Sequence, residues 1–310
     1  MFSVIFPGQG SQSVGMANEL YNKFETFKIN FKKADDLLNY QLSKIILEGP
    51  ADKLNLTENT QPAIFLISYS IFQVIKNEFE INLNEAKYFA GHSLGEYTAL
   101  TCSGVLSFEN TIKILKLRGK AMQEAVPKGE GGMIAVLGSK LEILEDIINK
   151  KKNEFRCFIA NDNSNGQIVL SGTMTNIDKL SVYLNSLNIK NIKLSVSAPF
   201  HCELMKTATE LMRNELAKIV FKEFQTSLIS NVTAKEIDDS LLIRDLLIRQ
   251  IESRVRWRES VNYMIKNGVN NFIEIGPGKV LSGLIKRIDK KVKVSAINNE
   301  EDIKKLKFND

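Results

Sequence analysis

One serine motif carries the clearest chemistry in this sequence. Ser93 lies in Gly91-His92-Ser93-Leu94-Gly95, between an expected short strand at Lys87–Gly91 and an expected helix at Leu94–Ser103. Strand, sharp turn and helix are the setting of a nucleophile elbow, in which the serine projects at the N-terminus of the helix. There the backbone N–H of Leu94 can face an oxyanion, and the helix dipole favours negative charge. The motif alone leaves open a tight turn with an idle serine.

A serine nucleophile needs a base, and the sequence has two histidines, His92 and His201. His92 neighbours the nucleophile, so we expect its side chain to point elsewhere and to form a hydrogen bond within the elbow. His201 follows an expected strand and precedes an expected helix, a junction at the sheet edge where the sites of α/β proteins lie. His201 is therefore the predicted base of Ser93, although a lone loop histidine can also lack a catalytic role.

Arg118 is the most informative charged residue. On the expected helix at Glu109–Val126 it falls on the apolar stripe with Ile114 and Ala121. A buried guanidinium is costly unless it is paired. Two interpretations stay open, namely a structural ion pair with an Asp or Glu, and a fork left open to hold a substrate carboxylate bidentately.

A glycine-rich turn, Pro7-Gly8-Gln9-Gly10-Ser11-Gln12, follows the expected first strand at Phe2–Phe6. Its glycines could cradle a phosphate, but the Lys-Ser/Thr pair of a P-loop and the spacing of a dinucleotide fingerprint are both missing. Alternatively, the backbone N–H of Gln9 completes an oxyanion hole with that of Leu94. By itself this turn is a weak signal.

The elements that would position these residues repeat as strand, turn and helix, which predicts a parallel sheet covered by helices. Gln61-Pro62 is expected to open a long buried helix that includes Ala63–Ile75, with the proline near its first turn. A late strand is expected at Asn271–Ile275. The fold class predicted for these segments, 1–127 and 198–310, is an α/β catalytic core.

Residues 128–197 have a different pattern of expected strands and helices, which begins after the linker-like run that follows Pro127. The expected order β-α-β-β-α-β is the ferredoxin-like pattern, so we predict a small inserted subdomain here. Thr175 and Asp178 fit a capping box at its second helix. The expected elements are strands at Met133–Leu137, Phe155–Ala160, Gln167–Ser171 and Asn191–Val196, and helices at Leu141–Lys151 and Asn176–Leu187.

Composition narrows the class of protein. Of 310 residues, 44% are hydrophobic and 25% charged, which is typical of a globular protein and unlike a disordered chain. Three dispersed cysteines and two histidines predict neither a zinc site nor a disulfide framework, and favour a cytoplasmic location. The start lacks the pattern of a secretory signal, and the most apolar stretch is too short to span a bilayer.

The formal net charge is +5, with basic residues gathered at Arg249–Arg258 and Lys286–Lys293. Such runs are usually a solvated surface, and the sharper alternative is a dock for an acidic partner or a phosphorylated ligand. No basic stripe with interleaved aromatic residues is present, so nucleic acid is not an expected partner.

Together these pieces resemble the malonyl-CoA:acyl carrier protein transacylase family, in an order that spans nearly the whole chain. The matching stretches are Phe6–Gln12, Thr60–Ala63, Gly91–Tyr97, Arg118–Met122, Ala198–His201 and Glu274–Gly278. The resemblance implies a hydrolase-like α/β core with a ferredoxin-like insert and a ping-pong reaction through a malonyl-serine. In that reaction His201 activates Ser93, the N–H groups of Gln9 and Leu94 hold the oxyanion, and Arg118 holds the malonyl carboxylate.

The resemblance also implies further site residues. A backbone carbonyl near Gln250 would orient His201 in place of a triad carboxylate. Asn161, Gln167 and Asn231 fall where the family has polar residues that line the pocket. Phe200 would fill the space that the α-methyl of a methylmalonyl group needs, and rejection of one methyl is worth only about 1–3 kcal/mol.

The family implies malonyl-CoA and acyl carrier protein as substrates, with fatty acid synthesis as the default pathway. We expect no cofactor, no metal and no membrane partner, and a monomer. A serine esterase or thioesterase with the same elbow is the alternative enzyme, but an esterase predicts an HGGG-type oxyanion loop and an acid before a late histidine. The sequence has no such loop and no histidine after His201. A non-catalytic carrier-binding module would have lost Ser93, His201 or Arg118.

Overall fold

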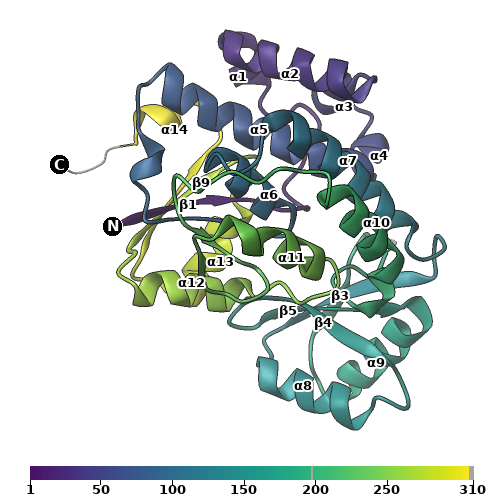
Figure 1. Cartoon of the computed structure of the whole chain (residues 1–310). Helices are drawn as coiled ribbons and strands as arrows, with labels where there is room; N and C mark the ends of the chain where they lie inside the picture. The colour runs from purple at the N-terminus through teal and green to yellow at the C-terminus, as the bar shows by residue number, and fades with distance from the viewer. Residues whose placement is uncertain (197, 307–310) are drawn as a thin grey trace.

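A parallel sheet forms the centre of the molecule. The computed structural model describes residues 1–196 and 198–306, in which six strands follow the order β10-β9-β1-β2-β7-β8 (Figure 1). Neighbouring strands are parallel except β7 and β8, which are antiparallel. These strands are β1 (Phe2–Phe6), β2 (Tyr88–Gly91), β7 (Leu228–Ile229), β8 (Glu236–Ile237), β9 (Asn271–Ile275) and β10 (Lys293–Ile297).

Helices cover both faces of this sheet, as a buried parallel sheet requires. Alternate side chains of β1 enter different hydrophobic clusters, with Val4 and Phe6 on one side and Ile5 on the other. The helices are α1 (Asn18–Lys23), α2 (Glu25–Leu38), α3 (Leu42–Glu48), α4 (Ala51–Leu54), α5 (Thr57–Asn77), α6 (Leu94–Cys102), α7 (Phe108–Glu124), α10 (Lys206–Leu216), α11 (Ser240–Gln250), α12 (Trp257–Lys266), α13 (Val280–Ile288) and α14 (Glu300–Lys304), with short 3₁₀ turns at Leu83–Glu85 and Glu203–Met205.

The buried helix α5 starts earlier than the sequence predicted. It begins at Thr57, so Pro62 lies inside the helix and does not open it. Proline at this position removes one helical hydrogen bond, but the residues before it are buried against neighbouring elements, and packing extends the helix towards its N-terminus. Among residues 1–196 and 198–306, no helix has both the length and the apolar character that a membrane span needs.

A second sheet, in the order β4-β5-β3-β6, forms a small layer beside the core, and all its neighbouring strands are antiparallel. One of its faces packs on the core cluster, and the other packs under α8 and α9 (Figure 1). Its elements are β3 (Gly131–Leu137), α8 (Leu141–Lys150), β4 (Cys157–Ser164), β5 (Gln167–Thr173), α9 (Met174–Ser186) and β6 (Asn191–Lys193). The expected fold class, an α/β parallel-sheet core with a ferredoxin-like insert, is confirmed.

Local boundaries of this small layer differ from the expectations. The cap of α9 is Thr173, whose hydroxyl accepts a hydrogen bond from the backbone N–H of Asn176, so the capping box expected at Thr175 and Asp178 is wrong. The strand β6 ends at Lys193, three residues early, because it is a short and mostly exposed edge strand. The domain limits 128 and 197 stay a prediction, and Ser197 lies outside the described residues.

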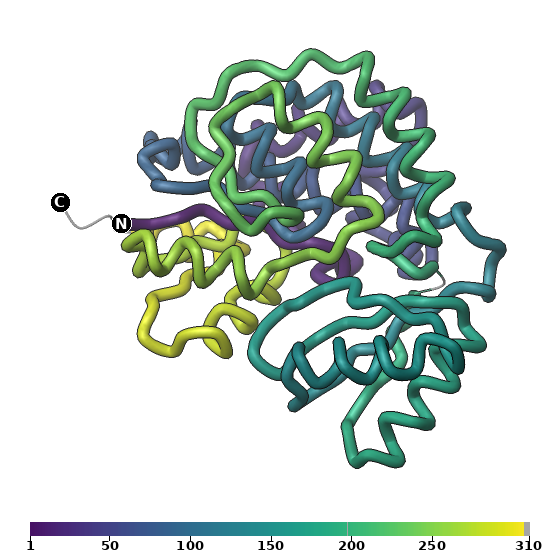
Figure 2. The backbone as a smooth tube through the Cα atoms, turned by 60° about the horizontal axis from the view of Figure 1, so that its bottom comes forward, coloured from purple at the N-terminus to yellow at the C-terminus, as the bar shows by residue number. Residues whose placement is uncertain are grey.

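The strand β4 joins the insert to the core through the segment at Val255. Its Asp162 N–H donates to the Val255 carbonyl at 2.9 Å, and the Val255 N–H donates to Ala160 at 2.8 Å. Arg258 on α12 pairs with the fully buried Asp162. Figure 2 shows the insert, in teal, lying against one end of the core.

Candidate active site

Ser93 stands on a strained turn between β2 and α6. Its φ of 54° and ψ of −110° are rare for a residue with a side chain, and such strain gathers at functional sites. The flanking glycines are required by close contacts, as the sequence predicted. A Cβ on Gly91 would lie 1.9 Å from the Gly95 carbonyl oxygen, and one on Gly95 would lie 2.3 Å from that of Phe6.

His201 lies against the nucleophile. Its Nε2 is 2.9 Å from Ser93 Oγ, and its Nδ1 is 2.8 Å from the backbone carbonyl oxygen of Gln250. A carbonyl only accepts hydrogen bonds, so Nδ1 must carry the proton and Nε2 is left as the acceptor for the serine hydroxyl. This is the tautomer that a general base needs. No carboxylate hydrogen-bonds to His201 among the described residues.

The imidazole of His201 is kept neutral by its surroundings. Burial, and to a smaller extent the positive charge of Arg118, lower the pKa of His201 to about 3. The side chain is 4% exposed. His201 is therefore ready to accept a proton across the whole neutral pH range.

Two backbone N–H groups border the serine without acceptors of their own. Those of Leu94, the first residue of α6, and of Gln9 have no hydrogen-bond partner among the described residues. A Cβ on Gly8 would lie 2.6 Å from the His92 carbonyl oxygen, so glycine lets the Gln9 turn approach the elbow. Unpartnered N–H groups at a helix N-terminus are suited to stabilise an oxyanion.

Arg118 is fully buried beside Ser93 and contacts only neutral acceptors. Its Nη1 donates to Gln61 Oε1 at 2.8 Å, and its Nη2 donates to Gln250 Oε1 at 2.9 Å and to Ser93 Oγ at 3.2 Å. Its Nε has no partner among the described residues. No ion pair forms to an Asp or Glu in this part of the chain, so the structural ion pair left open by the sequence is not what holds the guanidinium.

The packing of α7 against α5 places Arg118. A Cβ on the next residue, Gly119, would lie 2.4 Å from the Thr57 carbonyl oxygen, so the two helices meet at backbone contact there. Tyr97 of α6 covers the guanidinium, with its ring centre 5.4 Å from the carbon Cζ. The helical stripe in the sequence therefore gave the correct buried face.

Two polar groups of the site were missed at the sequence level, the side chains of Gln250 and Glu96. Gln250 Nε2 donates to the Ser93 carbonyl at 3.0 Å and to Glu96 Oε2 at 2.6 Å. Burial raises the pKa of Glu96 to about 7, against the opposing effect of its donors from Gln250 and Asn231.

A signal for Glu96 was present in the sequence. Ser93-Leu94-Gly95-Glu96 has the capping-box pattern, in which the serine hydroxyl and the glutamate bond reciprocally to the first turn of the helix. Neither bond forms. The Ser93 side chain does not cap α6, and its N–H is taken by Asn231. The side chains of Ser93 and Glu96 are therefore available for contacts within the site.

Asn231 holds the elbow from behind. Its Oδ1 accepts from the Ser93 N–H at 2.7 Å, and its Nδ2 donates to the Gly91 carbonyl at 2.7 Å. The side chain was expected to line a pocket, but both of its ends contact backbone. It therefore braces the strained turn.

Among the described residues, no hydrogen bond connects the remaining predicted pocket residues to Ser93, His201 or Arg118. Asn161 is buried in β4 opposite Val255, and Gln167 accepts from Arg287 Nη1 at 2.8 Å at an exposed position. Phe200, 8% exposed, precedes His201 in the core cluster. The roles expected of these three stay predictions.

His92 does not form the hydrogen bond within the elbow that the sequence led us to expect. Its Nε2 lies 2.8 Å from Asn163 Oδ1 on β4, and its ring centre lies 5.8 Å from that of Trp257. Burial lowers the pKa of His92. The side chain therefore links the elbow to the insert.

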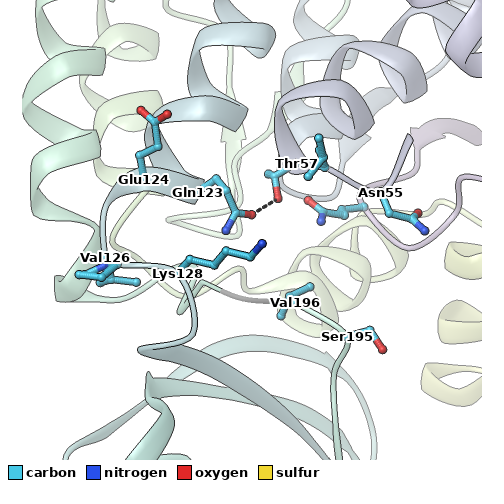
Figure 3. A pocket seen from close by; sticks show the side chains of 11 residues that line it. Asn55, Thr57, Gln123, Glu124, Val126, Lys128, Ser195 and Val196 are labelled. Carbon is cyan, nitrogen blue, oxygen red and sulfur yellow. Dashed lines mark hydrogen bonds between the residues drawn. The ribbon is translucent and has the colours of Figure 1, made fainter. Parts of the chain in front are cut away.

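A cavity of about 440 Å³ borders the Gln9 turn, between the large core and the two linkers of the insert. Figure 3 shows Thr57 and Gln123 joined by a hydrogen bond at its wall, with Lys128 extending across it. Its lining residues are Gln9, Asn55, Leu56, Thr57, Gln123, Glu124, Val126, Pro127, Lys128, Ser195 and Val196.

Known proteins share this architecture over nearly the whole chain. The acyl transferase domain family matches residues 3–306. The malonyl CoA-acyl carrier protein transacylase of Bacillus subtilis is 42% identical over 96% of this chain and 94% of its own length. The enzyme of that name from Escherichia coli is 38% identical over 96% of each chain.

Solved structures agree. The acyl-carrier-protein S-malonyltransferase of Bartonella henselae has a TM-score of 0.95 and 41% identity, covering 98% of this chain and 97% of its own. A malonyl transacylase solved in complex with a type II polyketide acyl carrier protein has a TM-score of 0.93 and 37% identity, covering 97% of each chain.

Proposed function

The chain belongs to the malonyl-CoA:acyl carrier protein transacylase family of acyltransferases, and on that premise we propose how its site transfers malonyl groups. The malonyl group passes from malonyl-CoA to Ser93 and then to the phosphopantetheine thiol of acyl carrier protein, supplying fatty acid synthesis. The observation that carries this proposal is the chain of contacts from Ser93 Oγ to His201 and on to the Gln250 carbonyl, with Arg118 beside the nucleophile.

The first half-reaction loads the serine. His201 Nε2 takes the hydroxyl proton while Ser93 Oγ attacks the thioester carbonyl of malonyl-CoA. The carbonyl oxygen becomes an oxyanion that the N–H groups of Gln9 and Leu94 stabilise. When the intermediate collapses, the carbon–sulfur bond breaks, and the proton on Nε2 passes to the sulfur of the departing CoA.

Arg118 gives the site its preference for an acyl group that ends in a carboxylate. A guanidinium carries five N–H donors, and those of Arg118 meet only neutral acceptors, with Nε left unpartnered among the described residues. A malonyl carboxylate supplies the missing charge and the missing acceptors. An acetyl group supplies neither.

The second half-reaction reverses the first with a different thiol. His201 takes the proton of the carrier's phosphopantetheine thiol, whose sulfur attacks the malonyl-serine ester. The oxyanion forms again, the bond to Ser93 Oγ breaks, and the serine recovers its proton from Nε2. In the net reaction, malonyl-CoA and the holo carrier are converted to CoA and the malonyl carrier. The esterase alternative is disfavoured, because a backbone carbonyl takes the place of the triad acid.

We also propose a cytoplasmic location, supported by the three cysteines, all of them free and buried. The malonyl transacylase solved with a carrier protein supports docking of such a carrier on this chain.

Initial-rate kinetics with both substrates varied test the proposal. Parallel double-reciprocal lines are expected, since the two substrates react in separate steps, and intersecting lines would contradict the acyl-serine route. His201→Ala should lose loading of Ser93, whereas His92→Ala, its matched control, should keep most of it. The reverse pattern would show that the base is assigned wrongly.

A further inference from the structure

The buried guanidinium of Arg118 raises the question of what balances its charge before substrate arrives. Burial of an ion without a partner costs several kcal/mol, and none of its hydrogen-bond acceptors is charged. The amide of Gln250 stands between Arg118 and Glu96. Its Oε1 accepts from Arg118 at 2.9 Å, and its Nε2 donates to Glu96 Oε2 at 2.6 Å.

This arrangement fixes the orientation of the Gln250 amide. A guanidinium only donates and an ionised carboxylate only accepts, so the amide can lie only one way round between them. The oxygen end of the Gln250 amide dipole then faces the positive guanidinium of Arg118, and its NH₂ end faces the negative carboxylate of Glu96. The main chain of Gln250 also holds His201, so the same residue meets the base, the guanidinium and Glu96.

We propose that Glu96 is a positioning residue that balances the charge of Arg118 at one remove, through the Gln250 amide, and so keeps the guanidinium fork open for a substrate carboxylate. A direct ion pair would occupy the same N–H groups that the substrate needs. With Glu96 one amide away, the charge is tolerated in the apo site and the donors stay available. This inference rests on the proposed function.

The chain offers variants that separate charge from hydrogen bonding. Glu96→Gln keeps an oxygen for the N–H groups of Gln250 and Asn231, and its new amide can donate to the Ser230 hydroxyl on the other side. Glu96→Ala removes the acceptor as well. Glu274→Gln is the matched control, because Glu274 is also fully buried and accepts from the first turn of α13, in a different hydrogen-bond network.

The experiment compares loading of Ser93 by malonyl-CoA and acetyl-CoA, measured by intact mass at pH 8.5, where Glu96 is ionised. Removal of its charge should strengthen the pull of Arg118 on a carboxylate, so Glu96→Gln should raise the malonyl-to-acetyl ratio of kcat/KM about tenfold and lower the malonyl-CoA KM. Glu274→Gln should leave this ratio unchanged. Glu96→Ala should slow loading by both donors, because the Gln250 amide loses its anchor.

A purely structural Glu96 would change both donors equally in Glu96→Gln, and that result overturns the inference. If Glu96→Gln folds poorly, a thermal double-mutant cycle with Arg118→Ala decides. The double variant should be more stable than the sum of the two single effects predicts, and additive effects would overturn the inference. A wild-type protein without any malonyl adduct would instead overturn the proposed function.

Discussion

Two buried charges of this protein are handled in opposite ways. Asp162, where the insert meets the core, is fully buried and receives both Nε and Nη2 of Arg258 at 2.9 Å. Arg118, beside Ser93, is equally buried and donates only to neutral oxygens. The first arrangement satisfies a charge and holds two layers together. The second leaves a charge with donors to spare, which is the condition for binding an anionic substrate.

The comparison shows how a structural charge can be told from a chemical one. Breaking a direct buried ion pair strands its partner and costs stability, whereas a buried ion without a direct charged partner already destabilises the fold. Removal of Arg118 should therefore harm the reaction and spare the fold, and removal of Asp162 should do the reverse.

The largest expected effect is that of Arg118→Ala on malonyl loading. Loss of the fork should cost about 3 kcal/mol in the transition state, or roughly 10²-fold in kcat/KM for malonyl-CoA, while acetyl loading is spared or improved. Mass analysis of Ser93 with each donor measures it. An equal loss with both donors would rule out the carboxylate role.

Asp162→Ala should destabilise the fold by about 3 kcal/mol, because Arg258 of α12 is left without its carboxylate where the insert meets the core. Thermal unfolding should show a fall in Tm of roughly 5 °C for a chain of this size. The comparison variant is Arg118→Met, expected to be neutral or stabilising. A larger fall in Tm for Arg118→Met than for Asp162→Ala would contradict the view that Asp162 is the structural charge and Arg118 the chemical one.

A smaller effect is expected at Phe200, next to the base. Phe200→Ala should open space for an α-methyl group and raise the kcat/KM for methylmalonyl-CoA relative to malonyl-CoA by about tenfold, in line with roughly 1–2 kcal/mol for one methyl. Competition between the two donors measures this ratio. An unchanged ratio would remove Phe200 from the pocket.

The smallest expected effect is that of pH on wild-type acetyl loading, which needs no substrate carboxylate and so does not report on Glu96, whose pKa is raised to about 7. His201 acts when neutral, and its pKa is lowered to about 3, so the rate of acetyl loading should change less than twofold between pH 8 and pH 5.5. An unperturbed histidine, with a pKa near 6.5, would lose roughly tenfold there. Because the positive charge of Arg118 contributes to the lowered pKa, Arg118→Ala should move the acid limb of acetyl loading upwards. A wild-type midpoint near pH 6.5 would contradict this account.

Local patterns in the sequence predicted the parts of the site that depend on neighbours along the chain. The glycines around Ser93 predict a sharp turn, and the apolar stripe around Arg118 predicts a buried helix face. Glu96 and Gln250 meet across 154 residues of sequence, a contact that periodicity and capping rules do not encode. The same reason explains the errors at His92 and Pro62, where packing against distant segments decided the outcome.

The most direct test of the central claim is the intact mass of the protein after malonyl-CoA is added, followed by peptide mapping and a chase with holo acyl carrier protein. We predict one malonyl adduct, located on Ser93, that moves to the carrier and regenerates the free enzyme. An adduct on another residue, an adduct that is only hydrolysed, or no adduct at all would contradict the account.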